Sequence, residues 1–272
     1  MYWENSEKLG ASPTWHKEAP PKLAVRPIQL ALKHQQQLFW AITLFPLFAL
    51  LLIGVAKLNL YWYIVLNRED GLVEWATALV YLVAAGFAIS LVLNFARRKE
   101  RIYALLYAGL TVGMTFVAME EISWGQRVFG VDTPDFVEDI NLQGEITFHN
   151  VEGFPLHEAY VAVGVYGAFS RMIATPILGK RYPHLVNLLT PPRALFLYFF
   201  IPALLYAYYE YLWHTELVPS DLEWGDYWTG RSGFLSGDDQ ESIELLLSLG
   251  FLLFTIVNWV RYRVAAPLTL DR

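Results

Sequence analysis

Six apolar stretches, each about twenty residues long, decide what this chain can fold into. An α-helix rises about 1.5 Å per residue, so about twenty apolar residues are needed to cross the hydrocarbon core of a bilayer. No period-two alternation of apolar and polar residues competes with these stretches, which argues against a transmembrane barrel. The sequence therefore predicts an all-α integral membrane protein with a bundle of six transmembrane helices. The predicted spans are about residues 38–56, 72–95, 102–119, 156–178, 194–213 and 243–260.

Composition supports a membrane protein and removes several classes of function. The chain is 55% hydrophobic and 16% aromatic, above the usual range of soluble domains. It has no cysteine, which excludes disulfides, thiolate metal sites and cysteine nucleophiles, and which fits a bacterial inner membrane. The net charge of −6 argues against a nucleic-acid partner. The sequence also lacks a nucleotide-binding loop, a GxSxG elbow, an HExxH helix and an EF-hand loop.

The distribution of basic residues predicts the orientation of the bundle. Loops rich in Lys and Arg stay in the cytoplasm, and the links between spans two and three and between spans four and five are the basic ones. Both termini are therefore expected in the cytoplasm (N-in, C-in). The basic residues behind this prediction are Arg97, Arg98, Lys99, Arg101, Lys180, Arg181, Arg193, Arg261 and Arg263.

The spans divide the chain into three predicted parts. Residues 1–36 form a polar, proline-containing N-terminal arm in the cytoplasm, and residues 37–263 form the membrane domain. Residues 264–272 are a cytoplasmic tail. Two long loops, about 120–155 and 214–242, are predicted on the outer side, and loops of this length are often functional.

Ionisable side chains gather at the predicted outer ends of five of the six spans. Of the 26 acidic residues, only five fall on the predicted cytoplasmic side, so the outer face is electronegative and suited to a cation. The residues at the outer helix ends are Glu74, Glu120, Glu121, His157, Glu158, Glu210, His214, Glu241 and Glu244.

Helical spacing suggests that some of these residues share a metal ion. Glu210 and His214 are four residues apart, and Glu241 and Glu244 are three apart, so each pair lies on one helix face. Helical bundles hold Zn, Fe or Mn with carboxylates and imidazoles at such spacings, whereas carboxylates alone suit Ca or Mg. The predicted cofactor is a divalent metal (Zn, Fe or Mn), with Glu145, His149 and Asn150 available from the loop above. The predicted metal ligands are Glu74, Glu120, Glu210, His214, Glu241 and Glu244; the candidate catalytic residues are Glu120, Glu121, His149 and His157.

Two other interpretations of the acids stay open. The acids can form a structural network with Arg127 and Arg231, or they can simply be solvated at the headgroups. Helix dipoles favour acids at helix starts but disfavour them at helix ends, where Glu120 and Glu121 lie. Of these two, Glu120 is expected to point into the bundle and Glu121 toward the loop or Arg127.

Small residues in two spans predict close helix packing. Gly109 and Gly113 form a GxxxG pattern in the third span, and Gly164 and Ala168 form a related pair in the fourth. Both patterns favour the close approach of a neighbouring helix.

Two classes of function follow. The first is a metal-dependent enzyme that acts on a lipid or lipid-linked substrate entering from the outer leaflet. In architecture, acids and histidines at one end of a helical bundle, this resembles membrane ceramidase-type metal hydrolases, although their motifs have no residue-by-residue match here. The alternative is a non-catalytic accessory subunit of a larger membrane complex, and a weaker third hypothesis is a cation sensor. The predicted partners are membrane lipids and other subunits.

Overall fold

The computed structural model describes residues 22–67, 71–138, 140–141, 144–148, 151, 153–208 and 239–264. The chain divides into two units, Met1–Trp40 and Ala41–Arg272. The described elements are α1 (Lys22–Ala56), η1 (Lys57–Asn59), α2 (Leu60–Asn67), α3 (Leu72–Arg97), α4 (Arg101–Glu121), η2 (Ser123–Gly125), α5 (Gln126–Phe129), α6 (Asp135–Glu138), α7 (Leu156–Leu178), α8 (Pro183–Leu189), η3 (Arg193–Leu195), α9 (Phe196–Ala207), α11 (Gln240–Trp259) and the π turn η6 (Val260–Val264).

Among the described residues, six helical segments are long and apolar enough to cross a membrane, which confirms the predicted helical architecture with six candidate spans. Within the described ranges no strand occurs, and the extended backbone pairs only in an isolated bridge between Asn141 and Val151. The orientation, the loop assignments and the domain boundaries stay predictions. The six segments are His34–Asn59, Tyr61–Arg97, Arg101–Glu121, Leu156–Leu178, Pro183–Ala207 and Gln240–Tyr262.

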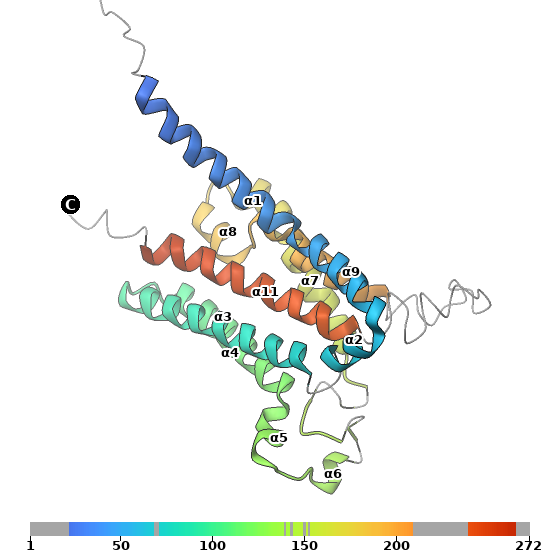
Figure 1. The fold of residues 1–272 in the computed structure, drawn as a ribbon. Helices are drawn as coiled ribbons and strands as arrows, with labels where there is room; N and C mark the ends of the chain where they lie inside the picture. The colour runs from blue at the N-terminus through green and yellow to red at the C-terminus, as the bar shows by residue number, and fades with distance from the viewer. Residues whose placement is uncertain are drawn as a thin grey trace, which may run out of the picture. The chain divides into compact units, whose positions relative to one another are not determined.

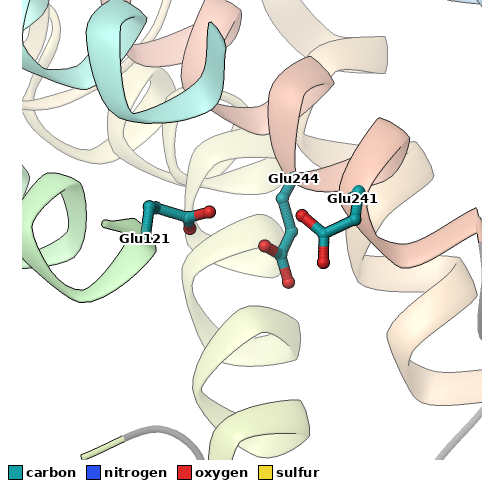
Figure 2. Close-up of side chains that lie close together, drawn as sticks. All are labelled: Glu121, Glu241 and Glu244. Atoms are coloured by element: carbon teal, nitrogen blue, oxygen red, sulfur yellow. The ribbon is translucent and has the colours of Figure 1, made fainter. Parts of the chain in front are cut away.

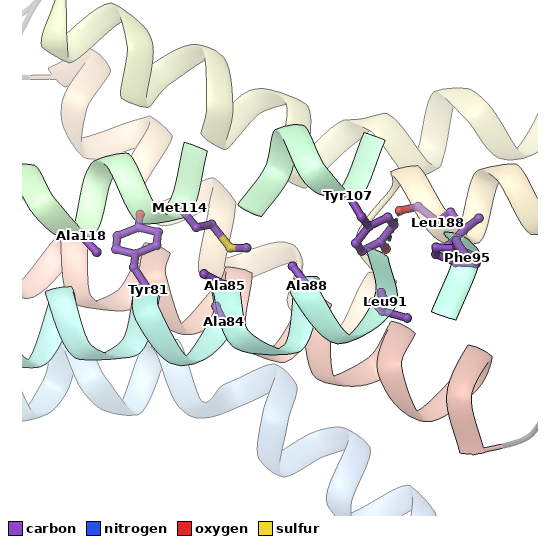
Figure 3. Packing of buried hydrophobic residues seen from close by; sticks show 10 residues of the cluster. All are labelled: Tyr81, Ala84, Ala85, Ala88, Leu91, Phe95, Tyr107, Met114, Ala118 and Leu188. Carbon is purple, nitrogen blue, oxygen red and sulfur yellow. Dashed lines mark hydrogen bonds between the residues drawn. The ribbon is translucent and has the colours of Figure 1, made fainter. Parts of the chain in front are cut away.

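One layer of the bundle is formed by α3, α4 and α11, which lie side by side (Figure 1). Helix α3 presents the small residues Ala84, Ala85 and Ala88 to this layer, and all three are buried. Small side chains let helix backbones approach closely, which is the main source of packing between membrane helices. Larger residues lie at both ends of the alanine row, with Tyr81 and Met114 at one end and Leu91 and Tyr107 at the other (Figure 3).

A second closely packed pair is α7 and α9, and here the contact depends on glycine. A Cβ added at Gly164 would lie 2.7 Å from both the Cβ of Ala203 and the carbonyl oxygen of Phe199. A Cβ added at Gly167 would lie 2.2 Å from the Phe199 ring, and one added at Gly250 of α11 would lie 3.2 Å from the same ring. Phe199 thus joins α9 to both α7 and α11. The close packing predicted at Gly164 is confirmed.

Buried polar contacts tie the helices together where α3 ends and α4 begins. The Asn94 side chain donates a hydrogen bond of 2.9 Å to the carbonyl oxygen of Tyr262, and Tyr107 donates one of 3.1 Å to that of Leu188 (Figure 3). Such contacts satisfy backbone carbonyls that an apolar layer would otherwise leave without partners.

At the opposite end of α3 and α11, an ion pair joins η1 and α2 to the start of α11. The Lys57 ammonium lies 2.7 Å from the Asp239 carboxylate, and the two side chains are only 8% and 4% exposed. The Tyr63 hydroxyl donates to the other oxygen of Asp239. Because a buried charge is costly without a partner, this ion pair fixes where α11 begins.

Candidate metal centre and adjoining cavity

Helix α4 ends in a backbone turn that few sequences adopt. Ser123, Trp124 and Gly125 follow one another with φ angles of 47°, 54° and 77°. Non-glycine residues rarely take positive φ, and a tryptophan there is strained. These three consecutive residues with positive φ reverse the chain one residue after Glu121. The loop therefore folds back against the end of its own helix.

Glu120 is held by this returning loop. Its carboxylate accepts hydrogen bonds from the Trp124 indole nitrogen at 2.5 Å and from the Phe148 backbone nitrogen at 2.7 Å. Its side chain is buried, at 4% exposure. Hydrogen bonds to a carboxylate are strong, and these two offset the unfavourable position of the acid at a helix C-terminus.

The rest of the loop is cross-linked by side chains. Ser123 donates to the Glu145 carboxylate, and both are buried. The Gln126 amide donates to Thr133 at 2.5 Å and accepts from the Ile146 backbone nitrogen at 2.7 Å. Because these buried polar groups are satisfied by partners within the loop, they hold it folded at the end of α4.

Glu121 points the other way, toward α11. One carboxylate oxygen from each of Glu121, Glu241 and Glu244 lies within 4.8 Å of the other two (Figure 2). Divalent ions bind oxygen ligands at about 2.0–2.6 Å, so the ligand oxygens of one ion lie no more than about 5 Å apart. This acidic triad therefore has the dimensions of an oxygen-ligand metal site.

Tyrosines surround the triad. The Tyr206 hydroxyl of α9 donates to Glu244, and its ring stacks on Tyr160 of α7 with ring centroids 4.3 Å apart. His157 lies 5.4 Å from the same Tyr206 ring, measured between ring centroids. The triad is thus positioned by residues of α4, α7, α9 and α11.

A cavity of about 400 Å³ adjoins the triad. It lies between α4 and α7, with residues of α11 and Tyr81 of α3 along its floor. Among the described residues that line it, the charged ones are Glu120, Glu121 and Glu244, and they lie together at one end. The rest of the lining is mainly apolar. An apolar cavity with a few converging polar groups is the usual form of a ligand site.

The structure brings only part of the predicted site together. Glu241 and Glu244 meet Glu121, which was assigned to catalysis rather than to the metal, and Glu74 is not part of this triad. The expected directions of Glu120 and Glu121 are reversed, because the left-handed turn brings the loop to Glu120.

Several predicted site residues are not described by the structure. Glu210 and His214, His149 and Asn150 lie outside the described residues, as do the Arg127 side chain and Arg231. Their assignments to metal binding, to catalysis or to an arginine network stay predictions.

Sequence reasoning missed Tyr206 and Tyr160. Their signals are present, because Tyr160 lies three residues after His157 and Tyr206 lies four residues before Glu210. At these spacings each shares a helix face with a residue that was selected.

The fold and the site together define a class: a helical protein with six candidate membrane spans and an acidic triad able to bind a metal ion. Comparison adds no relative to this description, since no protein family, curated protein or solved structure matches the chain.

Proposed function

We propose that this chain is a metal-dependent enzyme embedded in the membrane, which acts on a lipid or lipid-linked substrate. The observation that supports this most directly is the convergence of Glu121, Glu241 and Glu244 into a triad, two of whose members, Glu121 and Glu244, line a mainly apolar cavity. An ion bound there would supply Lewis acidity and an activated water, and the cavity would hold the apolar part of the substrate away from water. The reaction class that follows is hydrolysis.

The residues around the triad have distinct roles in this proposal. Glu121, Glu241 and Glu244 hold the ion, and the Tyr206 hydroxyl keeps Glu244 oriented. Glu120 is a positioning residue, because it fixes the loop over the site through Trp124 and Phe148. An all-oxygen ligand set favours Mn²⁺ among the predicted metals.

The test is metal content by mass spectrometry after purification in mild detergent and exposure to Mn²⁺. The wild-type protein should retain the ion through dialysis, and Glu121→Gln and Glu244→Gln should each reduce retained metal at least tenfold. Glu158→Gln is the matched control, because Glu158 is an exposed acid at the start of α7 that does not line the cavity. Wild-type protein that retains no ion, or triad variants that retain as much as the control, would overturn the proposal.

The accessory-subunit hypothesis draws on a different region. Apolar side chains of α1 within the second unit are well exposed, with Leu47 at 49% and Leu51 at 63%. Lipid or another chain can cover such a surface. Affinity purification from native membranes separates the two, because an accessory subunit should bring stoichiometric partners with it and a self-sufficient enzyme should not.

A further inference from the structure

The GxxxG pattern of α4 does not pack against another helix of the described part of the chain. A Cβ added at Gly109 or Gly113 would meet no atom within 4 Å, and both glycines are exposed and line the cavity. Among the described helices, the closely packed pairs are α3 with α4, α3 with α11, α7 with α9 and α9 with α11, and α4 with α7 is not one of them. The packing predicted at Gly109 and Gly113 is therefore wrong, and their missing side chains widen the cavity instead.

The cavity opens on the side of the bundle. Phe116 of α4 and Val163 of α7 line it from opposite sides, and they are 40% and 39% exposed. Both belong to candidate membrane spans, so in a bilayer the surroundings at this opening would be lipid rather than water. A molecule that enters here comes from the bilayer.

The length of the cavity matches one leaflet. It extends along α4 from Gly109 to Glu121, which at about 1.5 Å per residue is roughly 18 Å. Half of a hydrocarbon core of about 30 Å is about 15 Å. A lipid chain lying along the cavity would therefore bring its head to the carboxylates.

The charge of the cavity lining determines which lipid head groups are favoured. The described lining carries Glu120, Glu121 and Glu244 and no basic residue. A divalent ion held by the three carboxylates of the triad would still leave them with a net negative charge, and Glu120 adds to it. This end of the cavity favours a positively charged head and disfavours a purely anionic one.

We infer that the cavity binds a bilayer lipid whose hydrocarbon chain lies between α4 and α7 along Gly109 and Gly113 and whose ammonium-bearing head lies against Glu121 and Glu244. This inference deepens the proposed function by naming the substrate class of the same site.

The test reconstitutes the full chain in nanodiscs of equal parts phosphatidylethanolamine and phosphatidylglycerol, releases it gently, and counts retained lipids by native mass spectrometry. Both lipids carry a phosphate and only the first carries an ammonium group. Wild-type protein should retain phosphatidylethanolamine in at least fivefold preference. Equal retention of the two lipids, or a preference for phosphatidylglycerol, would overturn the inference.

Variants that fill the cavity test whether the retained lipid binds there. Gly113→Leu should reduce the retained lipid at least fivefold, whereas Gly86→Leu should not, because Gly86 is an exposed glycine of α3 that meets no neighbour and does not line the cavity. If Gly113→Leu does not fold, Val163→Trp narrows the cavity from α7 and should give the same loss. Retention equal to wild type in a folded cavity variant would contradict the inference.

Metal content measured on the same samples separates the two proposals. Gly113→Leu leaves the triad intact and should retain as much Mn²⁺ as wild-type protein. Selective lipid retention without any metal would end the metal-enzyme proposal and leave the lipid site standing. Metal retention with no difference between the two lipids would overturn the lipid-site inference and leave the metal-enzyme proposal standing.

Discussion

Helices α4 and α7 each carry two glycines, and the two pairs face opposite surroundings. Gly164 and Gly167 of α7 lie against α9 so closely that a single added carbon would overlap Ala203 or Phe199. Gly109 and Gly113 of α4 face open space. The same residue type brings two helices together in one place and keeps a cavity open in the other, so the neighbouring element decides what a small-residue pattern does.

The difference follows from where α4 makes its contacts. It packs against α3 through Tyr107, Met114 and Ala118, which are all buried. Its glycines lie on another face, where the nearest long helix is across the cavity. Helix α7 has its glycine face toward α9 and so has no free small-residue surface there.

The largest change in stability should come from removing the Phe199 ring, which packs against the glycines of α7. Phe199→Ala should lower the free energy of unfolding by about 4 kcal/mol, because it leaves a void between α7, α9 and α11. Titration into denaturing mixed micelles measures this. Phe116→Ala, on the cavity side, should cost about 1 kcal/mol or less, and equal costs would remove the contrast between the two faces.

A smaller loss is expected at the packed glycine itself. Gly164→Ala forces the new Cβ toward Ala203 and the Phe199 carbonyl oxygen, 2.7 Å away, so α7 and α9 must separate. Overpacking of this kind costs about 2 kcal/mol. The same micelle titration measures this loss. An unchanged unfolding midpoint would show that the α7–α9 interface can accommodate the added methyl group.

The smallest change in the free energy of unfolding should be a gain rather than a loss. Gly113→Ala adds a carbon that meets nothing, and alanine is favoured over glycine in a helix by about 0.5–1 kcal/mol, so the variant should be more stable than wild type. Gly86→Ala on α3 is the matched control and should gain by a similar amount. A loss at Gly113 with a gain at Gly86 would mean that another chain packs on the α4 glycines.

The spans could be predicted from the sequence because length and apolarity are local properties. Glu241 and Glu244 could be paired for the same reason, since three-residue spacing fixes their shared helix face. The structure adds Glu121 to them, which spacing alone does not show. Its position depends on α4 and α11 both packing against α3, which is a tertiary fact.

The side-chain directions of Glu120 and Glu121, which are opposite to those expected, could not be predicted from local sequence patterns. Apolar periodicity does not indicate that Ser123 and Trp124 adopt positive φ, because both residues usually avoid it. The turn brings the Phe148 nitrogen to Glu120, and only then is the direction of each carboxylate decided. The GxxxG pattern was misassigned for a related reason, since the sequence does not say which helix lies opposite.

The left-handed turn also sets how this protein can change over evolutionary time. Exposed positions of the candidate spans such as Leu105 and Val112, at 74% and 69% exposure, require only an apolar side chain. Positions 123–125 combine unusual backbone angles with side-chain contacts to Glu120 and Glu145, so very few residues satisfy both. Distant relatives of this chain should therefore be recognisable by the short EEISWGQ segment long after their membrane spans have diverged beyond detection.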